Sequence, residues 1–165
     1  MIYQIYTAIT SQLQTITGSS QNEICQIGIY NSQFDYLGDE GENSKVKEYV
    51  VTPAVFIEFT PITYNQLGLN VQQTDPFTVR IHLGTEVYTD NSLAILRLKE
   101  KVHGLLQGYQ QQGFNKLTRK SEQQDINHSN IYHFIMEYET VYRDTTTYLY
   151  PTSGTFSGTT IQYSI

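Results

Sequence analysis

The chain has 165 residues, of which 39% are hydrophobic and 16% are charged, and its formal net charge is −6. This length is enough for one domain with a single core. The acidic balance argues against a nucleic-acid-binding groove, because phosphate binding depends on clustered Lys and Arg side chains. Cys25 is the single cysteine, so no intramolecular disulfide can form; this disfavours a secreted, disulfide-stapled scaffold and points to synthesis in the cytoplasm.

The N-terminal segment has the pattern of an amphipathic helix and not that of a signal peptide. It lacks a basic n-region, and no stretch of the chain approaches the roughly 18 apolar residues of a membrane span, so we expect a soluble protein with no membrane partner. Apolar side chains recur instead at steps of three and four, which puts them on one face of a helix. They are Ile2, Ile5, Ile9, Leu13 and Ile16. Gly18 is expected to end this helix.

A short strand and a loop are expected after the helix. Residues 24–30 are β-branched and roughly alternating, which is typical of a strand or an extended connector. In residues 33–48, Gly and Asn residues typical of turns surround three carboxylates, Asp39, Glu40 and Glu42. We expect a mobile surface loop there. Its carboxylates fit a solvated turn, and they also fit a loop that contacts another subunit.

Two strands separated by a long linker are predicted next. The first runs from Pro53 to Phe59 and is half-buried, with the proline at its start. Residues 60–76 are expected to be a linker, and linkers of that length in compact domains are usually functional or disordered. The second strand, Phe77 to Leu83, has the clearest alternation in the chain, with Arg80 and His82 opposite its apolar face.

The stretch from Leu93 to Tyr109 is predicted to be the main helix. Residues 90–92 offer side-chain oxygens that can cap its first turn. Lys99, Glu100 and Gln107 are expected to face outward. The opposite stripe is apolar and consists of Ile95, Leu98, Val102, Leu105, Leu106 and Tyr109.

Two antiparallel strands are expected to close the domain. Residues 114–126 read as an exposed strand that carries a basic cluster, Lys116, Arg119 and Lys120. Residues 130–144 read as a long strand paired with it. One face of this long strand has Tyr132, Phe134, Met136, Tyr138 and Tyr142, and the other has His133, Glu137 and Glu139.

The last 21 residues differ in composition from the rest of the chain. After Asp144 there is no charged side chain and no apolar period that would build a core, so residues 1–144 are predicted to form the domain and residues 145–165 an extended C-terminal arm. A frayed terminus is the alternative. Aromatic and β-branched residues in such arms often dock by adding a strand to a neighbour.

No catalytic, cofactor-binding or metal-binding group is predicted. The four histidines lack the spacing of a zinc site, although His82 and His133 could meet across the polar face of the sheet as ordinary hydrogen-bonded residues. Glu58, Glu137 and Glu139 could gather on that face, and paired carboxylates can serve glycoside hydrolysis. A sheet surface that faces water or another subunit also explains them.

The order of the elements resembles the tail terminator (tail completion) family of tailed bacteriophages, which includes small head–tail connector proteins. The likeness covers roughly residues 1–144. It lies in a Pro-led strand, "TPAVFIEF", a strand that ends in a polar turn, "FTVRIHLGTE", and a main helix, "NSLAILRLKEKVHGLLQGY". An aromatic strand of an antiparallel pair follows, "NIYHFIMEYETVYRD". The long linker and the neutral arm depart from the family pattern.

This resemblance implies an α+β domain, with a mainly antiparallel sheet of about four strands and two helices packed on one face. It implies a homomeric ring of six or twelve copies at the head–tail interface of a virion, assembled in the host cytoplasm. Its partners would be a portal-side connector ring and tail proteins, and DNA would pass through its lumen without sequence-specific binding. The sheet face that carries Arg80, His82, Glu137 and Glu139 would then look into the lumen or at a neighbour.

Contact sites in such a ring are expected in the acidic loop, the linker, the polar strand face and the arm. The residues are Asp39, Glu40, Glu42, Leu67, Leu69, Arg80, Tyr148, Tyr150, Phe156, Ile161 and Tyr163. Two other functions stay open. One is a small intracellular enzyme with a concave pocket around the three glutamates, and the other is a monomeric adaptor that binds through its Tyr-rich faces.

Overall fold

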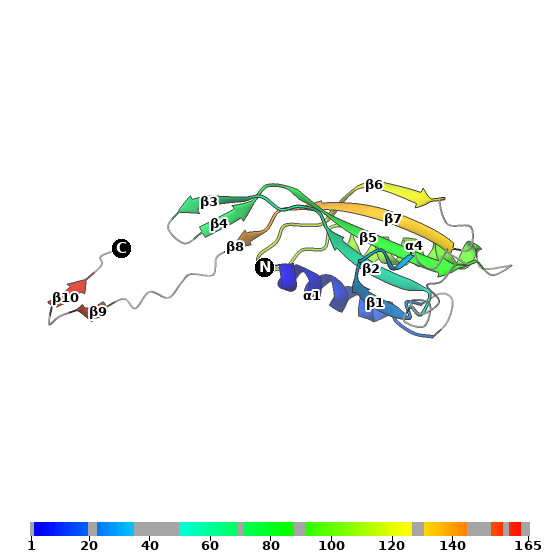
Figure 1. Cartoon of the computed structure of the whole chain (residues 1–165), viewed down its shortest axis with the longest axis horizontal. Coiled ribbons are helices and arrows are strands. Elements are labelled where there is room, and N and C mark those ends of the chain that lie inside the picture. The colour runs from blue at the N-terminus through cyan, green and yellow to red at the C-terminus, as the bar shows by residue number, and fades with distance from the viewer. Residues whose placement is uncertain are drawn as a thin grey trace.

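The structure is a computed structural model, which describes residues 2–19, 23–34, 50–68, 71–87, 92–126, 131–144, 153–156 and 159–162. Its centre is a five-stranded sheet in the order β1-β2-β5-β7-β6 (Figure 1). The strands are β1 Gln26–Ile29, β2 Ala54–Phe59, β5 Phe77–Glu86, β6 Thr118–Asp125 and β7 Ile131–Thr140. β1 runs parallel to β2, and the other pairs are antiparallel. The predicted α+β class is confirmed, with β1 as a fifth strand at the edge.

Two helices cover one face of this sheet, as predicted. They are α1, Ile2–Leu13, which continues into the short 3-10 turn η1, Gln14–Ile16, and α4, Ser92–Leu106. The core between helices and sheet is one cluster that includes Ile5, Ile9, Leu98, Val102 and Leu106 from the helices and Val55, Ile57, Val79, Ile81 and Leu83 from the strands. In the part of the chain that the structure describes, no helix has the length and apolar character that crossing a bilayer requires.

Helix α4 ends at Leu106, and the turn that follows it contains Gly108. Gly108 has φ +77°, a left-handed conformation that glycine adopts without the clash a Cβ would cause. Its N–H donates to the Leu117 carbonyl at 2.8 Å, and the Leu117 N–H donates to the Tyr109 carbonyl at 2.8 Å. These bonds turn the chain back towards β6.

Lys99 was expected to face outward from α4, and this prediction is wrong. The residue is only 9% exposed. Its ammonium group reaches Glu122 Oε1 on β6 at 2.7 Å and lies 5.5 Å from the centre of the Phe134 ring. The helical spacing put Lys99 on the outward face, and only the position of β6 shows that the carboxylate of Glu122 meets it there.

Residues 60–76 were expected to be a linker, and the structure instead has a β-hairpin there. β3, Tyr64–Gly68, pairs antiparallel with β4, Val71–Thr74, and β8, Arg143–Asp144, adds a third strand. The hairpin extends beyond the end of the five-stranded sheet (Figure 1). Its strands are mainly amide-bearing and polar, so the apolar alternation that marks a strand in sequence is missing. The hairpin is instead held by backbone pairing between β3 and β4.

The expected surface loop at residues 33–48 begins with a core residue. Phe34 is fully buried and belongs to a second apolar cluster, on the sheet face opposite the helices, with Ala54, Phe56 and Ile131. A Cβ on Gly84 of β5 would lie 2.4 Å from the Phe34 ring, so the missing side chain makes room for that ring. Residues 35–49, including the acidic cluster, lie outside the described residues.

The C-terminal segment contains a hairpin where a single extended arm was expected. β9, Ser153–Phe156, pairs antiparallel with β10, Thr159–Gln162, as a separate two-stranded sheet. The remaining residues of the segment 145–165 lie outside the described ones. The domain boundary at residue 144 stays a prediction.

We expect Phe34→Ala to lower the free energy of unfolding by about 3–4 kcal/mol, because it removes a fully buried aromatic ring and leaves a cavity above Gly84. Urea denaturation followed by circular dichroism at pH 7 measures this change. Gln14→Ala is the control, since that side chain is exposed and its loss should change the free energy by less than about 0.5 kcal/mol. A similar, small change for both variants would contradict the packing of Phe34 on the sheet.

Candidate functional site

The sheet face opposite the helices carries a row of polar residues, one from each of four strands. The register pairs Glu58 of β2 with Arg80 of β5, Arg80 with Glu137 of β7, and Glu137 with Ser121 of β6. Residues directly opposite in antiparallel strands point to the same side of the sheet. The row therefore follows from strand register alone, and we call these four residues the charged row.

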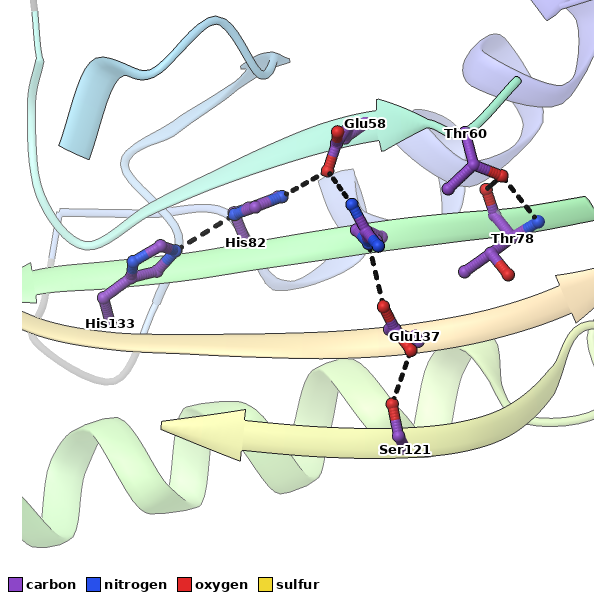
Figure 2. A network of polar contacts seen from close by, with 8 residues as sticks. Glu58, Thr60, Thr78, His82, Ser121, His133 and Glu137 are labelled. Atoms are coloured by element: carbon purple, nitrogen blue, oxygen red, sulfur yellow. Dashed lines mark hydrogen bonds and ion pairs between the residues drawn. The ribbon is translucent and has the colours of Figure 1, made fainter. Parts of the chain in front are cut away.

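The charged row is held together by ion pairs and hydrogen bonds (Figure 2). Arg80 Nε donates to Glu137 Oε1 at 2.8 Å, and Arg80 Nη1 lies 3.4 Å from Glu58 Oε2. Ser121 Oγ donates to the second oxygen of Glu137, Oε2, at 2.6 Å. The three charged side chains are between 30% and 39% exposed, so this row is at the surface but is not fully solvated.

The contacts of Glu137 keep it ionised. The hydrogen bond from Ser121, together with that from Arg80, lowers the pKa of the Glu137 carboxyl below its ordinary value. The same interaction, led by the hydrogen bond to Glu137, raises the pKa of Arg80. A general acid needs a carboxyl group whose pKa is raised towards neutral pH. The pKa of Glu137 is instead lowered. This argues against the glycosidase-like role considered from the sequence.

A histidine pair continues the polar network along the sheet. His82 Nδ1 lies 3.0 Å from His133 Nε2, and His82 Nε2 lies 3.1 Å from Glu58 Oε2 (Figure 2). His133 Nδ1 lies 3.4 Å from Asp125 Oδ2. The expectation that His82 and His133 meet across this face is confirmed. They form a line of contacts from Asp125 to the charged row.

The histidine pair is buried, although its face was expected to look into a lumen or at a neighbour. His82 is 3% exposed and His133 is 1% exposed. The Tyr30 ring is stacked on the His82 ring, with 3.6 Å between the centroids and 5° between the planes, and the Phe34 ring lies 4.8 Å from His133. The segment after β1 therefore covers this part of the face. Arg80, Glu137 and Glu139 remain partly accessible there.

Two members of the predicted basic cluster, Arg119 and Lys120 on β6, are paired with carboxylates. Lys120 Nζ lies 2.8 Å from Glu139 Oε1, and Arg119 Nη1 lies 2.7 Å from Glu122 Oε2. Lys99 contacts Glu122 from the other side, and its hydrogen bond is the main reason that the pKa of Glu122 is lowered. This pairing argues against a positive patch for phosphate groups on this strand.

Most of the contact residues expected from the sequence fall in parts that the structure does not describe. Asp39, Glu40, Glu42, Leu69, Tyr148, Tyr150 and Tyr163 lie outside the described residues, and the side chains of Phe156 and Ile161 in the C-terminal hairpin do too. Leu67 lies on β3 and is 55% exposed. Arg80 is the centre of the charged row, so its first partners are within its own chain.

Sequence analysis missed an exposed apolar area on α4. Leu93 is 65% exposed and Leu96 is 41% exposed, and they line a surface hollow together with Arg97, Glu100 and Lys101. The sequence does contain an indication of this exposed area, because both leucines lie off the apolar stripe that faces the core. A second hollow, lined by Gln110–Asn115 and Arg143, is polar. Neither hollow includes the carboxylates of the charged row.

Within the described ranges, no group of three or more His, Cys, Asp or Glu side chains is arranged to hold a metal ion. Each carboxylate of the charged row has a cation or hydroxyl partner. Such a network can fix strands relative to one another. It offers little for acid–base chemistry at neutral pH.

Comparison with known proteins identifies a fold and no family. No family model matches the chain, and no curated protein matches its sequence. Among solved structures, it is similar to a chain in the virion of a native gene transfer agent particle, with a TM-score of 0.51 and 9% sequence identity. The match covers 84% of this chain and 94% of that chain. At this identity the likeness is one of fold.

Replacing Arg80 with Met should destabilise the protein, because it leaves Glu58 and Glu137 close together without the guanidinium that bridges them. We expect the free energy of unfolding at pH 7 to fall by about 1 kcal/mol, a value limited by the partial exposure of the row. Lys120→Met is the matched control. It removes an ion pair between side chains 51% and 41% exposed, for which a loss under about 0.5 kcal/mol is expected. Equal losses in urea denaturation would contradict a special role for Arg80.

The acid stability of the protein should depend on Glu137. Because its pKa is lower in the folded state, the unfolded chain binds more protons at acidic pH, so this contribution is present above the ordinary glutamate pKa and is lost as pH falls through the folded value. We expect the stability gap between wild type and Glu137→Gln to be largest at pH 7 and to narrow between pH 5 and pH 3. Urea denaturation at a series of pH values tests this, with Glu139→Gln as control. A gap of constant size would refute it.

Proposed function

We propose that this chain is a structural protein of a phage-like virion, which forms a homomeric ring of six or twelve copies at the head–tail interface and joins the tail tube to the head-side connector. The observation that carries the proposal is the shared fold, since the match extends over 94% of a chain from a virion. The resemblance of the element order to the tail terminator family supports the same role. Both likenesses concern the helix-backed sheet rather than a catalytic residue.

The two faces of the sheet suit a wall of a channel better than an active site. Helices α1 and α4 bury one face, and ion pairs tie four strands together on the other. A sheet supported in this way can keep its curvature under load, because its strands are fixed both by packing and by cross-strand polar contacts. The net charge of −6 disfavours adhesion of DNA to the protein.

Exposed apolar residues at the two ends of β5 offer surfaces for contact between copies. Tyr64 and Leu67 lie on the hairpin that precedes β5, and Leu93 and Leu96 lie on the first turns of α4, which follows it. Ten residues of strand separate these areas by roughly 30 Å. Different surfaces at opposite ends of a subunit support head-to-tail contacts, and such contacts form a ring when the rotation closes.

The test is the assembly state of the purified protein and its dependence on these surfaces. We expect wild-type protein to form concentration-dependent oligomers in mass photometry and rings in negative-stain electron microscopy. Leu67→Glu and Leu96→Glu should each shift the distribution to smaller species by at least about tenfold in apparent dissociation constant, because each puts a charge into an apolar contact. Gln14→Glu, a charge added at an exposed site outside both areas, is the control.

The outcomes separate the proposed ring from its proposed contacts. The ring hypothesis would be refuted if wild-type protein stayed monomeric at all concentrations, also in mixtures with purified tail and connector proteins. That result would favour the adaptor hypothesis. Rings that form equally well in both Leu→Glu variants would keep the ring and refute the two contact areas. Circular dichroism of each variant shows whether it is folded.

A further inference from the structure

The outer side of α4 carries a ridge of exposed residues, opposite the side of the helix that packs on the sheet. The ridge consists of Leu93, Arg97, Glu100 and Gly104, all of them exposed. They follow one another at steps of four, three and four positions, which puts them on one line along a helix. We call these four residues the α4 ridge. A molecule that approaches α4 from solvent meets this ridge first.

Gly104 has no structural reason within the described part of its own chain. A Cβ at this position would have no atom of that part within 4 Å, so no close packing there requires the side chain to be absent. Glycine in the middle of a helix lowers stability relative to alanine, because it loses more backbone freedom on folding. The missing side chain leaves a recess on the ridge, where a second molecule can come close to the helix backbone.

The two charged residues of the ridge are opposite in sign. Glu100 lies 3.6 Å from Lys99 of its own chain, but Lys99 has its shorter contact, 2.7 Å, with Glu122. The Glu100 side chain is 65% exposed, so its carboxylate is accessible to a further cation. A partner surface of one charge sign would repel either Arg97 or Glu100. The ridge therefore fits a partner that presents both signs in matching order.

We propose that the α4 ridge binds the α4 ridge of a second copy, with the two helices antiparallel about a two-fold axis. In such a pair, positions before the axis on one helix lie level with positions after it on the other. With the axis midway between Arg97 and Glu100, Arg97 of each copy faces Glu100 of the other, and Leu93 faces Gly104. Opposite charges then meet twice, and each leucine fills the recess over the other copy's glycine. An isologous contact requires this self-complementarity.

Leu96 adds apolar area to the same contact. It is 41% exposed and lies beside the ridge, in the surface hollow on α4. A two-fold axis keeps each flank of the helix pair on its own side, so the Leu96 side chains of both copies gather on one flank. The contact consists of one helix face from each copy, which is small for a protein interface. The dimer is therefore weak and reversible.

This dimer goes beyond the proposed ring, because it is a state of copies outside the ring. The ring contact joins opposite ends of neighbouring copies, whereas the two-fold contact joins the same helix of two copies. Both contacts use Leu93 and Leu96, so one subunit makes only one of them at a time. The dimer covers an apolar ring contact in copies that are not yet assembled.

The experiment is sedimentation velocity of the full chain over a range of concentrations. Arg97→Glu and Glu100→Arg should each raise the dissociation constant of the dimer by at least about tenfold, because the axis repeats each like-charge contact twice. An equimolar mixture of these two variants should regain the wild-type constant, since one chain then has two acidic positions and the other two basic ones. Lys116→Glu reverses an exposed cation outside α4 and is the control.

A second variant tests the recess without changing a charge. Gly104→Gln places a side chain where Leu93 of the other copy should enter, so the dissociation constant should again rise by at least about tenfold. The position has room for a Cβ within its own chain, so the variant is expected to fold. Circular dichroism of all variants checks that they do.

The mixing result distinguishes this dimer from the ring, because only a contact between two α4 helices regains affinity when opposite reversals are combined. The dimer would be overturned by variants that associate as well as wild type, or by a mixture that associates no better than its components. Rings seen by electron microscopy together with either result would leave the proposed function standing. Regained association in a protein that never forms rings would support the dimer and count against the ring.

Discussion

The register between β5 and its two neighbours, β2 and β7, is the constraint on which the rest of the structure depends. Along β5 the side chains of Val79, Ile81 and Leu83 enter the core under the helices, while Arg80 and His82 lie on the opposite face. Because side chains alternate strictly along a strand, a slip of one residue would exchange the two sets. The apolar packing that fixes this register therefore also brings Glu58 and Glu137 to the two sides of Arg80.

The two faces are stabilised by different interactions, and each depends on the other. The helix side is an ordinary hydrophobic core, which supplies most of the favourable free energy. The polar side adds ion pairs, which contribute little singly at a surface but hold neighbouring strands in one alignment. The close fit of the Phe34 ring over Gly84 lets the segment after β1 exclude water from His82 and His133. Their contacts are consequently those of a low-dielectric site inside an otherwise solvated face.

This organisation is compatible with a fold that persists without sequence identity. The similar virion chain shares 9% of its residues with this one over nearly its whole length. A helix-backed sheet requires alternation in its strands and a stripe in its helices, and many residues satisfy either pattern. Such a fold supplies a scaffold, and the specific properties of a member lie in what its edges, hairpins and loops present. In this chain the hairpin β3–β4 and the outer side of α4 are among the described parts with exposed apolar side chains.

The sequence by itself determined the elements with strong apolar periods: the helix at residues 2–13, the central strand with Arg80 and His82, the main helix and the long strand that carries His133 and Glu137. It also indicated that the polar side chains of those strands share a face, because alternation is a local property. Only the tertiary structure decided which of them touch. The hairpin in residues 60–76 has no apolar signal, the burial of Lys99 depends on Glu122 from another strand, and Phe34 becomes a core residue because Gly84, fifty positions away, leaves space for its ring. Contacts between residues far apart in the chain are set by strand register and packing, which no local pattern contains.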